Sequence, residues 1–376
     1  MKRWQWQEII MINRIVFAAG GTGGHIYPAI AIADELVKMN SKVEIKFIGA
    51  KGRIEERIIP ANGYKLETIE VSGFKRSLNY KNISAAFKIF KALKDSKKIL
   101  KDFAPELVYG TGGFVSGPVL KAAQSLNIRN VIEEGNFHPG VTVKLVAPKA
   151  DKVILNFEGT KKLLKRSDNT VVMSYPVREN MKRMPKNDAA SFFGLDGNRK
   201  ILFVFGGSQG AHSINSALMK CFKNLTGSGL QIIWQTGNTD YDTVNSAVSS
   251  NKDVKVLKYI DNMAAAYSAG DLALCRSGIS TIMELACFGL PAIFVPYPQA
   301  SENHQEKNAR AVSEKNAAEI ILDKDLNQKL ESSVLRLLSD DNKLKYMGMN
   351  ISGMADTKAA SKIAEMLTEM VNNSKN

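Results

Sequence analysis

The stretch that decides the fold is Arg14-Ile15-Val16-Phe17-Ala18-Ala19-Gly20-Gly21-Thr22-Gly23-Gly24-His25, an apolar run followed by a glycine-rich turn. A helical pattern from Pro28 to Met39 comes directly behind it. Strand, glycine turn and helix in this order point backbone N–H groups and a positive helix end at a phosphate, and here the turn also carries an imidazole. A second copy, residues 201–205 followed by the turn 206–210, predicts two nucleotide-fold domains that face each other across a cleft.

The composition is that of a globular protein large enough for two domains. With 376 residues, of which 44% are hydrophobic and 23% charged, each half of the chain can bury its own core. The cysteines Cys221, Cys275 and Cys287 lack metal-ligand spacing, and their odd number argues against a disulfide framework. Their apolar neighbours predict buried, unreactive thiols, which fits a reducing cytoplasm.

The amino-terminal residues do not make a convincing secretion signal, because only the short run 9–12 follows the basic start and Asn13 and Arg14 interrupt it. We expect residues 1–10 to be an upstream start, in preference to an interfacial tail, since Met11 opens the chain just before the first strand. No stretch approaches the roughly 20 apolar residues of a membrane span.

The net charge of +14 indicates an anionic partner: nucleic acid, a membrane or a polyanionic substrate. No RNA-binding signature or aromatic–basic interleave supports nucleic acid. Between residues 81 and 101, lysines recur at helical spacing opposite an apolar stripe; the lysines are at 91, 94, 98 and 101, and the stripe is Ile83, Phe87, Phe90 and Leu93. Periodicity alone favours a surface helix with solvated lysines over a basic face held near anionic lipid.

The remainder of the chain alternates short apolar runs with helical patterns, as βαβ units of parallel sheets require. Residues 181–199 are polar and predict a linker that leads into a helix, and residues 357–371 predict a final helix. Further strands are expected at 43–48, 65–71, 107–109, 131–133, 153–155, 231–235, 272–274 and 292–295. The predicted fold class is therefore α/β.

His25 is the first candidate for chemistry. A histidine at a helix start is often a cap or a surface residue. The positive end of a helix, however, favours the neutral imidazole that a general base requires. Next to a phosphate-type loop, we favour the catalytic interpretation. Nicotinamide binding is disfavoured, because Ile48-Gly49-Ala50 stands where a ribose-binding acid is expected.

Three further turns follow predicted strands and are candidate binding loops. The turn at 109–118 is glycine-dense and is either a packing turn or a lip for a second substrate. The turn at 133–140 carries Glu133, Glu134 and Asn136; the carboxylates either pair with lysines or serve the site, and the amide can read a sugar. At 275–284, small polar residues can surround a diphosphate. Glu284 lies in a mostly apolar helix, where a carboxylate without a function or a partner is unusual.

Two Asp-x-Asp triplets, 240–242 and 323–325, resemble the metal-holding triplets of some sugar transferases. Both stand at predicted helix starts, where aspartate is the expected cap. We therefore predict no metal site.

In this order, the motifs resemble the MurG family, the UDP-N-acetylglucosamine transferases that make lipid II in peptidoglycan synthesis. The resemblance runs from about Asn13 to the final helix; its most specific segments are 20–25, 111–118, 206–211, 276–284, 289–291, 304–305 and 308–309. It implies the GT-B fold, with two Rossmann-like domains whose parallel sheets face across a cleft. The acceptor domain would be residues 1–177 joined by the helix 357–376, and the UDP-sugar domain residues 178–356.

The resemblance implies an inverting, metal-independent transfer without a cofactor, in which the carbon-4 hydroxyl of N-acetylmuramic acid in lipid I attacks UDP-N-acetylglucosamine. His25 matches the family's loop histidine proposed as base. The donor-binding residues would be Thr22, Gly23, Gly24, Asn136, Arg178, Ser208, Gln209, Ile260, Ile279, Ser280, Thr281, Ile282, Met283, Glu284 and Gln305. The acceptor side would include Gly112, Gly113, Phe114, Ser116 and Glu134.

Because the acceptor is a lipid, we now favour the interpretation that the basic helix attaches the protein to a membrane, and Phe74-Lys75-Arg76 would contribute to the same surface. The implied location is the anionic cytoplasmic face of the bacterial membrane, with peripheral attachment. Cell-wall synthesis proteins are further implied partners. The chain departs from the family pattern at Gly135, where glutamine is usual, at Tyr175, where asparagine is usual, and at His212, where arginine is common.

Three other functions stay open at this point. A related transferase that glycosylates diacylglycerol would share the C-terminal half of the pattern. A UDP-N-acetylglucosamine 2-epimerase would share the fold and would need acid–base carboxylates, for which Glu133 and Glu134 are the candidates. A sugar-nucleotide sensor would retain the donor site without the reaction.

Overall fold

The computed structural model describes residues 11–71, 81–177, 181–207 and 209–372, and the side chains of residues 81–87 lie outside the description. The chain divides into two compact units. The first unit is Met1–Arg178 with Thr357–Asn376, and the second is Glu179–Asp356.

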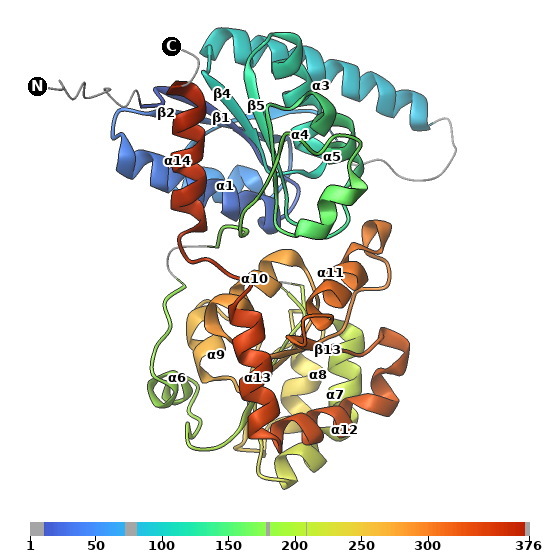
Figure 1. Ribbon diagram of the computed structural model, residues 1–376. Coiled ribbons are helices and arrows are strands. Elements are labelled where there is room, and N and C mark those ends of the chain that lie inside the picture. Colours follow the sequence, from blue (N-terminus) through green and yellow to red (C-terminus); the bar gives the residue numbers. More distant parts are fainter. Residues whose placement is uncertain (1–10, 72–80, 178–180, 208, 373–376) are drawn as a thin grey trace, which may run out of the picture. The chain divides into compact units, whose positions relative to one another are not determined.

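The first unit is a three-layer α/β structure (Figure 1). Its strands are β1 (Arg14–Ala18), β2 (Glu44–Ala50), β3 (Lys65–Ile69), β4 (Leu107–Gly110), β5 (Arg129–Glu134), β6 (Lys152–Leu155) and β7 (Thr170–Val172). Its helices are α1 (Gly23–Met39), α2 (Glu55–Ala61), α3 (Lys81–Phe103), α4 (Gly113–Ser125), α5 (Val141–Val146) and α14 (Ala359–Asn372). In the described residues the strands form one parallel sheet of order β3-β2-β1-β4-β5-β6-β7. The chain adds strands outward from β1 to one side and then outward from β4 to the other, so the strand order reverses between β1 and β4.

Strand β1 shows why the sequence forms this sheet. Ile15 and Phe17 pack on the face covered by α1, α2 and α14, whereas Val16 and Ala18 pack on the face covered by α3, α4 and α5. A strand buried on both faces must be apolar throughout, which is the pattern of residues 15–18.

The final helix returns to the first unit. Helix α14 lies alongside α1 (Figure 1) and buries Ile363, Ala364, Leu367 and Val371 in the same core as the apolar face of α1. The helix predicted at 357–371 is therefore present, as Ala359–Asn372.

The second unit repeats the plan. Its strands are β8 (Ile201–Phe205), β9 (Gln231–Gln235), β10 (Val254–Leu257), β11 (Leu272–Cys275), β12 (Ala292–Phe294) and β13 (Ala318–Ile320). Its helices are α6 (Lys186–Phe192), α7 (His212–Gly227), α8 (Tyr241–Val248), α9 (Met263–Ala269), α10 (Ile279–Phe288), α11 (His304–Ser313), α12 (Leu326–Leu338) and α13 (Asp341–Ser352). Among the residues described, its parallel sheet has the order β10-β9-β8-β11-β12-β13, so the order in which the chain adds strands reverses between β8 and β11.

Strand β8 divides the core of this unit in the same way. Leu202 and Val204 pack against the side of α7, α8, α12 and α13. On the other side, Phe203 and Phe205 stack with ring centroids 4.5 Å apart, and Tyr267 of α9 meets Phe203 edge-on at 5.5 Å. The aromatic cluster fixes α9 against the centre of the sheet.

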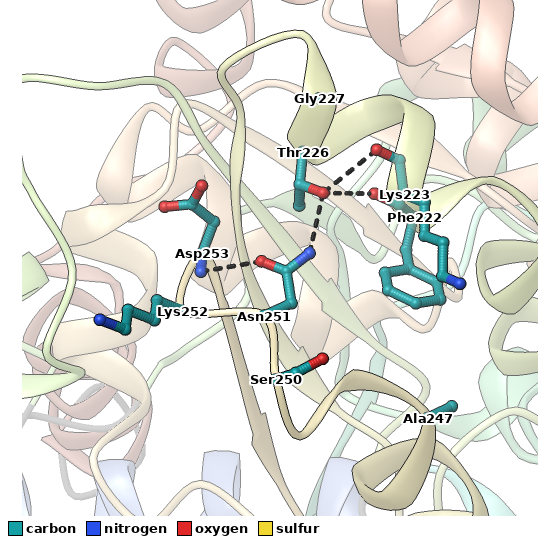
Figure 2. Close-up of a pocket in the computed structure, with 9 residues that line it drawn as sticks. All are labelled: Phe222, Lys223, Thr226, Gly227, Ala247, Ser250, Asn251, Lys252 and Asp253. Carbon is teal, nitrogen blue, oxygen red and sulfur yellow. Dashed lines mark hydrogen bonds between the residues drawn. The ribbon is translucent and has the colours of Figure 1, made fainter.

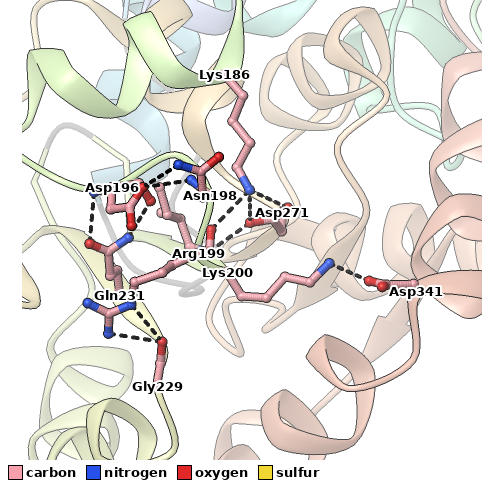
Figure 3. A network of polar contacts seen from close by, with 10 residues as sticks. Lys186, Asp196, Asn198, Arg199, Lys200, Gly229, Gln231, Asp271 and Asp341 are labelled. Carbon is pink, nitrogen blue, oxygen red and sulfur yellow. Dashed lines mark hydrogen bonds and ion pairs between the residues drawn. The ribbon is translucent and has the colours of Figure 1, made fainter.

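The polar segment before β8 is anchored to the second unit (Figure 3). Lys186 at the start of α6 donates to both oxygens of Asp271, at 2.8 and 2.9 Å, and to the carbonyl of Arg199 at 3.0 Å. Asp271 also accepts from the N–H of Ile201, at 2.7 Å. The linker predicted at 181–199 thus includes a helix tied to the sheet it precedes.

The structure corrects two of the expected elements. Helix α1 begins at Gly23, ahead of Pro28, so His25 lies in the first helical turn and not on the loop. In α3, Phe90 is 70% exposed, and the buried face consists of Ala92, Ser96 and Leu100. Ile83 and Phe87 of the predicted stripe lie outside the described side chains.

The thiols follow the prediction in two of three positions. Cys221 and Cys275 are buried, while Cys287 is half-buried. Burial raises the pKa of all three thiols, that of Cys287 to about 11, so each stays protonated and unreactive near neutral pH.

A buried carboxylate holds the first glycine turn. Glu55, the first residue of α2, is fully buried and accepts hydrogen bonds from the N–H of Gly21 at 3.1 Å and of Ala50 at 2.9 Å. Gly20 has no Cβ because that atom would lie 2.3 Å from Glu55 Oε1. The Gly21 N–H therefore points at a carboxylate of the protein itself, which removes it from the set of amides available to a phosphate.

A second buried carboxylate ends β5. Glu133 is 2% exposed, and its Oε2 accepts a 3.0 Å hydrogen bond from the hydroxyl of Tyr109. Its Oε1 is buried without a hydrogen-bond partner among the described residues. Burial raises the pKa of Glu133 to about 8, against the opposing effect of the Tyr109 hydrogen bond. The side chain is therefore mostly protonated at neutral pH.

Replacing Glu55 with leucine should lower the free energy of unfolding by roughly 2–5 kcal/mol, because the Gly21 and Ala50 N–H groups lose their acceptor inside the protein. The measurement is urea denaturation. The matched control is Glu56→Leu, since Glu56 is exposed and accepts from Gly52 at 2.9 Å. Equal losses for the two variants would contradict a buried anchoring role for Glu55.

The free energy of unfolding should fall as the pH rises, because Glu133 is harder to deprotonate in the folded protein than in the unfolded chain. The folded protein keeps this proton up to about pH 8, whereas an unfolded chain loses it near the ordinary value of 4.5, so the folded state binds more protons between the two. Glu133→Gln should remove a loss of up to about 1.4 kcal/mol per pH unit in that window. The measurement is urea denaturation at pH 5.5, 6.5 and 7.5. A stability difference from wild type that stays constant over these pH values would refute the assignment.

Candidate functional site

In the first unit, the candidate site lies where β1 and β4 end side by side. In this arrangement the loops after the two strands meet at the carboxyl edge of the sheet, at the point where the strand order reverses. His25 Nδ1 lies 2.7 Å from the backbone carbonyl of Thr111, which follows β4. Because a carbonyl only accepts, Nδ1 carries the hydrogen, and in the neutral ring Nε2 then carries the lone pair. This is the tautomer that accepts a proton through Nε2.

Two glycines make room for this imidazole. Gly112 and Gly113 have φ of +83° and +69°, which favour glycine. A Cβ on Gly113 would lie 3.1 Å from Nε2 and Cδ2 of His25, and one on Gly112 would lie 3.6 Å from its Cε1. The predicted acceptor-side glycines therefore pack against the predicted base.

The other predicted residues of the two turns are gathered here as well. Thr22 is the exposed N-cap of α1, followed by Gly23 and Gly24. The ring of Phe114 packs over the first turn, since a Cβ on Gly21 would lie 2.7 Å from it. The structure thus brings together the segments 20–25 and 111–114.

Ser116, predicted on the acceptor side, makes two hydrogen bonds inside the first unit. Its hydroxyl is fully buried and lies 2.9 Å from the carbonyl of Ala18 and 2.6 Å from that of Gly112. The side chain thus links the two turns, and its assignment to the acceptor side stays a prediction.

Glu134 also has an internal role. Its Oε2 accepts from the N–H of Gly140 at 2.7 Å, and its Oε1 accepts from the N–H and the side-chain amide of Asn136, at 2.9 and 3.0 Å. Burial raises the pKa of Glu134, and these hydrogen bonds oppose the rise. The carboxylate closes the loop 134–140 on itself and orients Asn136, and its assignment to the acceptor side stays a prediction.

In the second unit, the glycine turn after β8 packs tightly on the loop after β9. A Cβ on Gly210 would lie 1.9 Å from the carbonyl of Thr236, and Gln209 is exposed at the tip of the turn. Gln235 joins this turn to Ile260, one of the predicted donor-binding residues: its Nε2 donates to the Gly207 carbonyl at 3.0 Å, and its Oε1 accepts from the N–H of Ile260 at 2.8 Å. Nothing in the sequence marks Gln235 for this role except its place at the end of a predicted strand.

The predicted residues of α10 divide into two groups. Ile279, Ser280 and Thr281 form its first turn after the N-cap Gly278, at the carboxyl edge of β11. Ile282 and Met283 have fully buried side chains in the core, and their assignment as donor-binding residues stays a prediction.

Glu284 and Gln305 are held by neighbours. Glu284 Oε2 accepts from the hydroxyl of Tyr267 at 2.8 Å, which explains a carboxylate on a mostly buried helix. Gln305 Oε1 accepts from the N–H of Tyr297 at 3.0 Å, and its carbonyl accepts from the buried hydroxyl of Ser277 at 2.8 Å. Both side chains are therefore fixed in direction.

Arg276 is a further organising residue that the sequence analysis did not single out as a site. It pairs with Asp323 at 2.5 Å, and it donates to Ser213 at 2.8 Å and to the carbonyl of Val295 at 3.1 Å. It thus connects the start of α7 to the ends of β11 and β12. Asp323 belongs to one of the Asp-x-Asp triplets, and Asp240 of the other accepts from Asn215 at 2.7 Å.

The described residues contain no group of three His, Cys, Asp or Glu side chains that could hold a metal ion. Arg178, Ser208, residues 74–76 and residues 1–10 all lie outside the described part of the chain. The predictions made for them therefore stay predictions.

A separate hollow of about 410 Å³ lies between the end of α7 and the start of β10 (Figure 2). It is lined by Phe222, Lys223, Thr226, Gly227, Ala247, Ser250, Asn251, Lys252 and Asp253. Asn251 spans it, donating to Thr226 at 2.9 Å and accepting from the Asp253 N–H at 3.0 Å. It lies at the amino edge of the sheet, opposite the edge that carries the predicted site residues, and contains none of them.

Helix α3 presents a basic, partly apolar surface. Lys88, Lys91, Lys94, Lys98 and Lys101 are exposed, and so is the ring of Phe90. Lys91 pairs with Glu70 at 2.9 Å, and this pair lowers the pKa of Glu70. Among the described helices, none combines the length and apolar character needed to cross a bilayer.

The chain matches two domains of a known glycosyltransferase family. Residues 15–155 match the glycosyltransferase family 28 N-terminal domain, and residues 201–366 match the family 28 C-terminal domain. The structure is similar to the crystal structure of MurG from Acinetobacter baumannii, with a TM-score of 0.76, 25% identity, and 95% and 99% of the two chains covered. It shares its fold with a UDP-GlcNAc 2-epimerase from Neisseria meningitidis, with a TM-score of 0.67, 14% identity, and 95% and 100% of the chains covered.

Two curated relatives extend over nearly the whole chain. The protein of Caldanaerobacter subterraneus subsp. tengcongensis is 38% identical over 94% of this chain and 99% of its own length, and that of Chlorobaculum parvum is 40% identical over 89% and 93%. Both are named UDP-N-acetylglucosamine–N-acetylmuramyl-(pentapeptide) pyrophosphoryl-undecaprenol N-acetylglucosamine transferase. The GT-B fold and the MurG resemblance are thereby confirmed, and the chain belongs to this family of N-acetylglucosamine transferases.

Proposed function

We propose that this N-acetylglucosaminyltransferase moves the sugar of UDP-N-acetylglucosamine onto the carbon-4 hydroxyl of N-acetylmuramic acid in lipid I, which yields lipid II. Membership of the family supports both substrates. Within the site, the proposal is carried by the hydrogen bond between His25 Nδ1 and the Thr111 carbonyl, because it prepares Nε2 to accept a proton.

The chemistry is a single displacement. The acceptor oxygen forms a bond to the anomeric carbon while the bond to the UDP oxygen breaks on the opposite side, so the configuration inverts. His25 Nε2 takes the hydroxyl proton, and the electron pair leaves with UDP. The amino end of α1, where His25 lies, disfavours an imidazolium before the reaction and so maintains the base in its neutral form.

The second unit would hold the donor. Ile260 lies against the uracil, Glu284 accepts from the ribose hydroxyls, and the turn 206–210 with the start of α10 receives the diphosphate. The amino ends of α7 and α10, together with Arg178, stabilise the charge that grows on UDP. In this proposal the helix ends supply what a metal ion supplies in other transferases, and no cofactor takes part.

The carboxylates required by the epimerase alternative are engaged elsewhere. Glu133 is 2% exposed and paired with Tyr109, and Glu134 closes its own loop. Neither carboxylate is presented to a substrate in the way that acid–base chemistry requires, so glycosyl transfer is the function the first unit supports best.

Replacing His25 with alanine should lower kcat by roughly 10²- to 10⁴-fold, because the general base is lost. The assay follows labelled N-acetylglucosamine from UDP-N-acetylglucosamine into a short-chain lipid I analogue, with EDTA present. Calorimetric binding of UDP to both proteins is the control for an intact second unit.

Each contrary outcome selects another function. Transfer by His25→Ala at the wild-type rate would reject His25 as base, and loss of wild-type transfer in EDTA would reject metal independence. If the wild type binds UDP and makes no product, the lipid I acceptor is wrong and a glycerolipid acceptor or a sensor is indicated. Consumption of donor without acceptor would indicate an epimerase or hydrolase.

We further propose that the protein attaches peripherally to the cytoplasmic face of the bacterial membrane through α3. An exposed aromatic ring flanked by lysines suits the boundary of an anionic bilayer, where each basic residue contributes about 1 kcal/mol. Val141 and Leu145 of α5, on the same face of the sheet as α3, add 55% and 61% exposed apolar side chains. Cell-wall synthesis proteins are proposed as additional partners on this membrane.

The combined variant Phe90→Asp/Lys94→Glu should reduce binding to vesicles of phosphatidylcholine and phosphatidylglycerol about tenfold, because it removes the apolar anchor and reverses a charge. The measurement is co-sedimentation, with pure phosphatidylcholine vesicles as reference. Phe192→Asp is the matched control, since Phe192 is 63% exposed on the second unit. Equal losses for the two proteins would reject α3 as the membrane surface.

A further inference from the structure

The first turn of α1 has a gap in its hydrogen bonding. In an α-helix the N–H of residue 28 donates to the carbonyl of residue 24, but Pro28 has no N–H. Gly24 therefore needs another donor for its carbonyl. This gap falls next to His25, the residue that carries the imidazole of the proposed reaction.

The hydroxyl of Tyr175 fills the gap. It donates to the Gly24 carbonyl, and the Tyr175 side chain is 4% exposed. The backbone of Tyr175 is fixed too, because its N–H donates to Asn156 Oδ1 at 2.9 Å. A buried hydroxyl and a carbonyl without a helical donor thus satisfy each other across the amino end of α1.

His25 is consequently held from two directions. The loop after β4 holds its ring through the 2.7 Å contact between Nδ1 and the Thr111 carbonyl. Tyr175, from the segment after β7, holds the peptide group that immediately precedes it. The ring still moves if its backbone frays, so the contact to the Gly24 carbonyl contributes to where Nε2 lies.

We propose that Tyr175 is a positioning residue for His25 in the transfer reaction. The inference rests on the proposed function and adds a residue outside the predicted donor and acceptor sets. Tyr175 acts through the backbone of the first helical turn, since its hydroxyl is directed to a main-chain carbonyl and not to a reacting atom.

Tyr175→Phe should lower kcat about tenfold and leave KM for UDP-N-acetylglucosamine within twofold of wild type, because the base is misplaced while the donor site is untouched. Tyr64→Phe is the matched control. The Tyr64 hydroxyl donates to Asp34, which is also on α1 but beyond its first turn. This variant should lower thermal stability without changing kcat.

A rescue experiment separates positioning from general destabilisation. Pro28→Ala supplies the missing N–H, so the Gly24 carbonyl regains a helical donor. In that background, Tyr175→Phe should change kcat by less than twofold. The rescue also covers the case in which the single variant folds poorly.

Two results would overturn the positioning role: an unchanged kcat in Tyr175→Phe, or the same tenfold loss in the Pro28→Ala background. Failure of the proposed function looks different, because the wild type itself would then make no lipid II and His25→Ala would have nothing to lose. In that event the inference falls with the reaction it serves.

Discussion

The first unit's site depends on one alignment, in which β1 and β4 end at the same level. Ala18 pairs with Gly110, and the Ala18 carbonyl then accepts from the N–H of Thr111 at 3.2 Å and from the hydroxyl of Ser116 at 2.9 Å. Since Thr111 is fixed in this way, its own carbonyl stands at a set place for the His25 ring. A slip of one residue between the two strands would separate the imidazole from its acceptor and would turn every β4 side chain to the other face.

Each unit has a glycine turn after its first central strand, and the two turns are held by different side chains. In the first, the glycine turn is filled from inside by Glu55, which leaves the turn as a support for the helix that carries His25. In the second, the turn after β8 is held at its base by an uncharged amide, Gln235. An anionic ligand is repelled by a carboxylate and tolerated by an amide, so the second turn suits the proposed diphosphate better than the first.

The strands that are buried on both faces of a sheet could be predicted from the sequence. The apolar runs 201–205 and 231–235 identified central strands because no other environment accepts them. Edge strands β7, β10 and β13 were missed, as they are three or four residues long and mostly only half-buried. Short runs that mix polar and apolar residues look like loops until a neighbouring strand supplies the pairing.

The same limit applies to the site. His25 and the glycines 112 and 113 were predicted for the site from two separate motifs, and only the fold shows that they pack together. Ser116 and Glu134 were predicted on the acceptor side, and the sequence does not tell that their polar atoms also bond inside the unit. Glu55 was overlooked because its partner Gly21 is 34 residues away, and only the fold brings them together.

Helix α14 has a consequence for biosynthesis. A ribosome must complete the entire second unit before Ile363, Leu367 and Val371 emerge to cover the apolar face of α1. Until then, the nascent first unit exposes part of its core while the second can already fold, the reverse of the usual order from the amino terminus. The growing chain therefore has a period of vulnerability whose length is set by the translation of residues 179–372, and nascent-chain chaperones have most to contribute during that period.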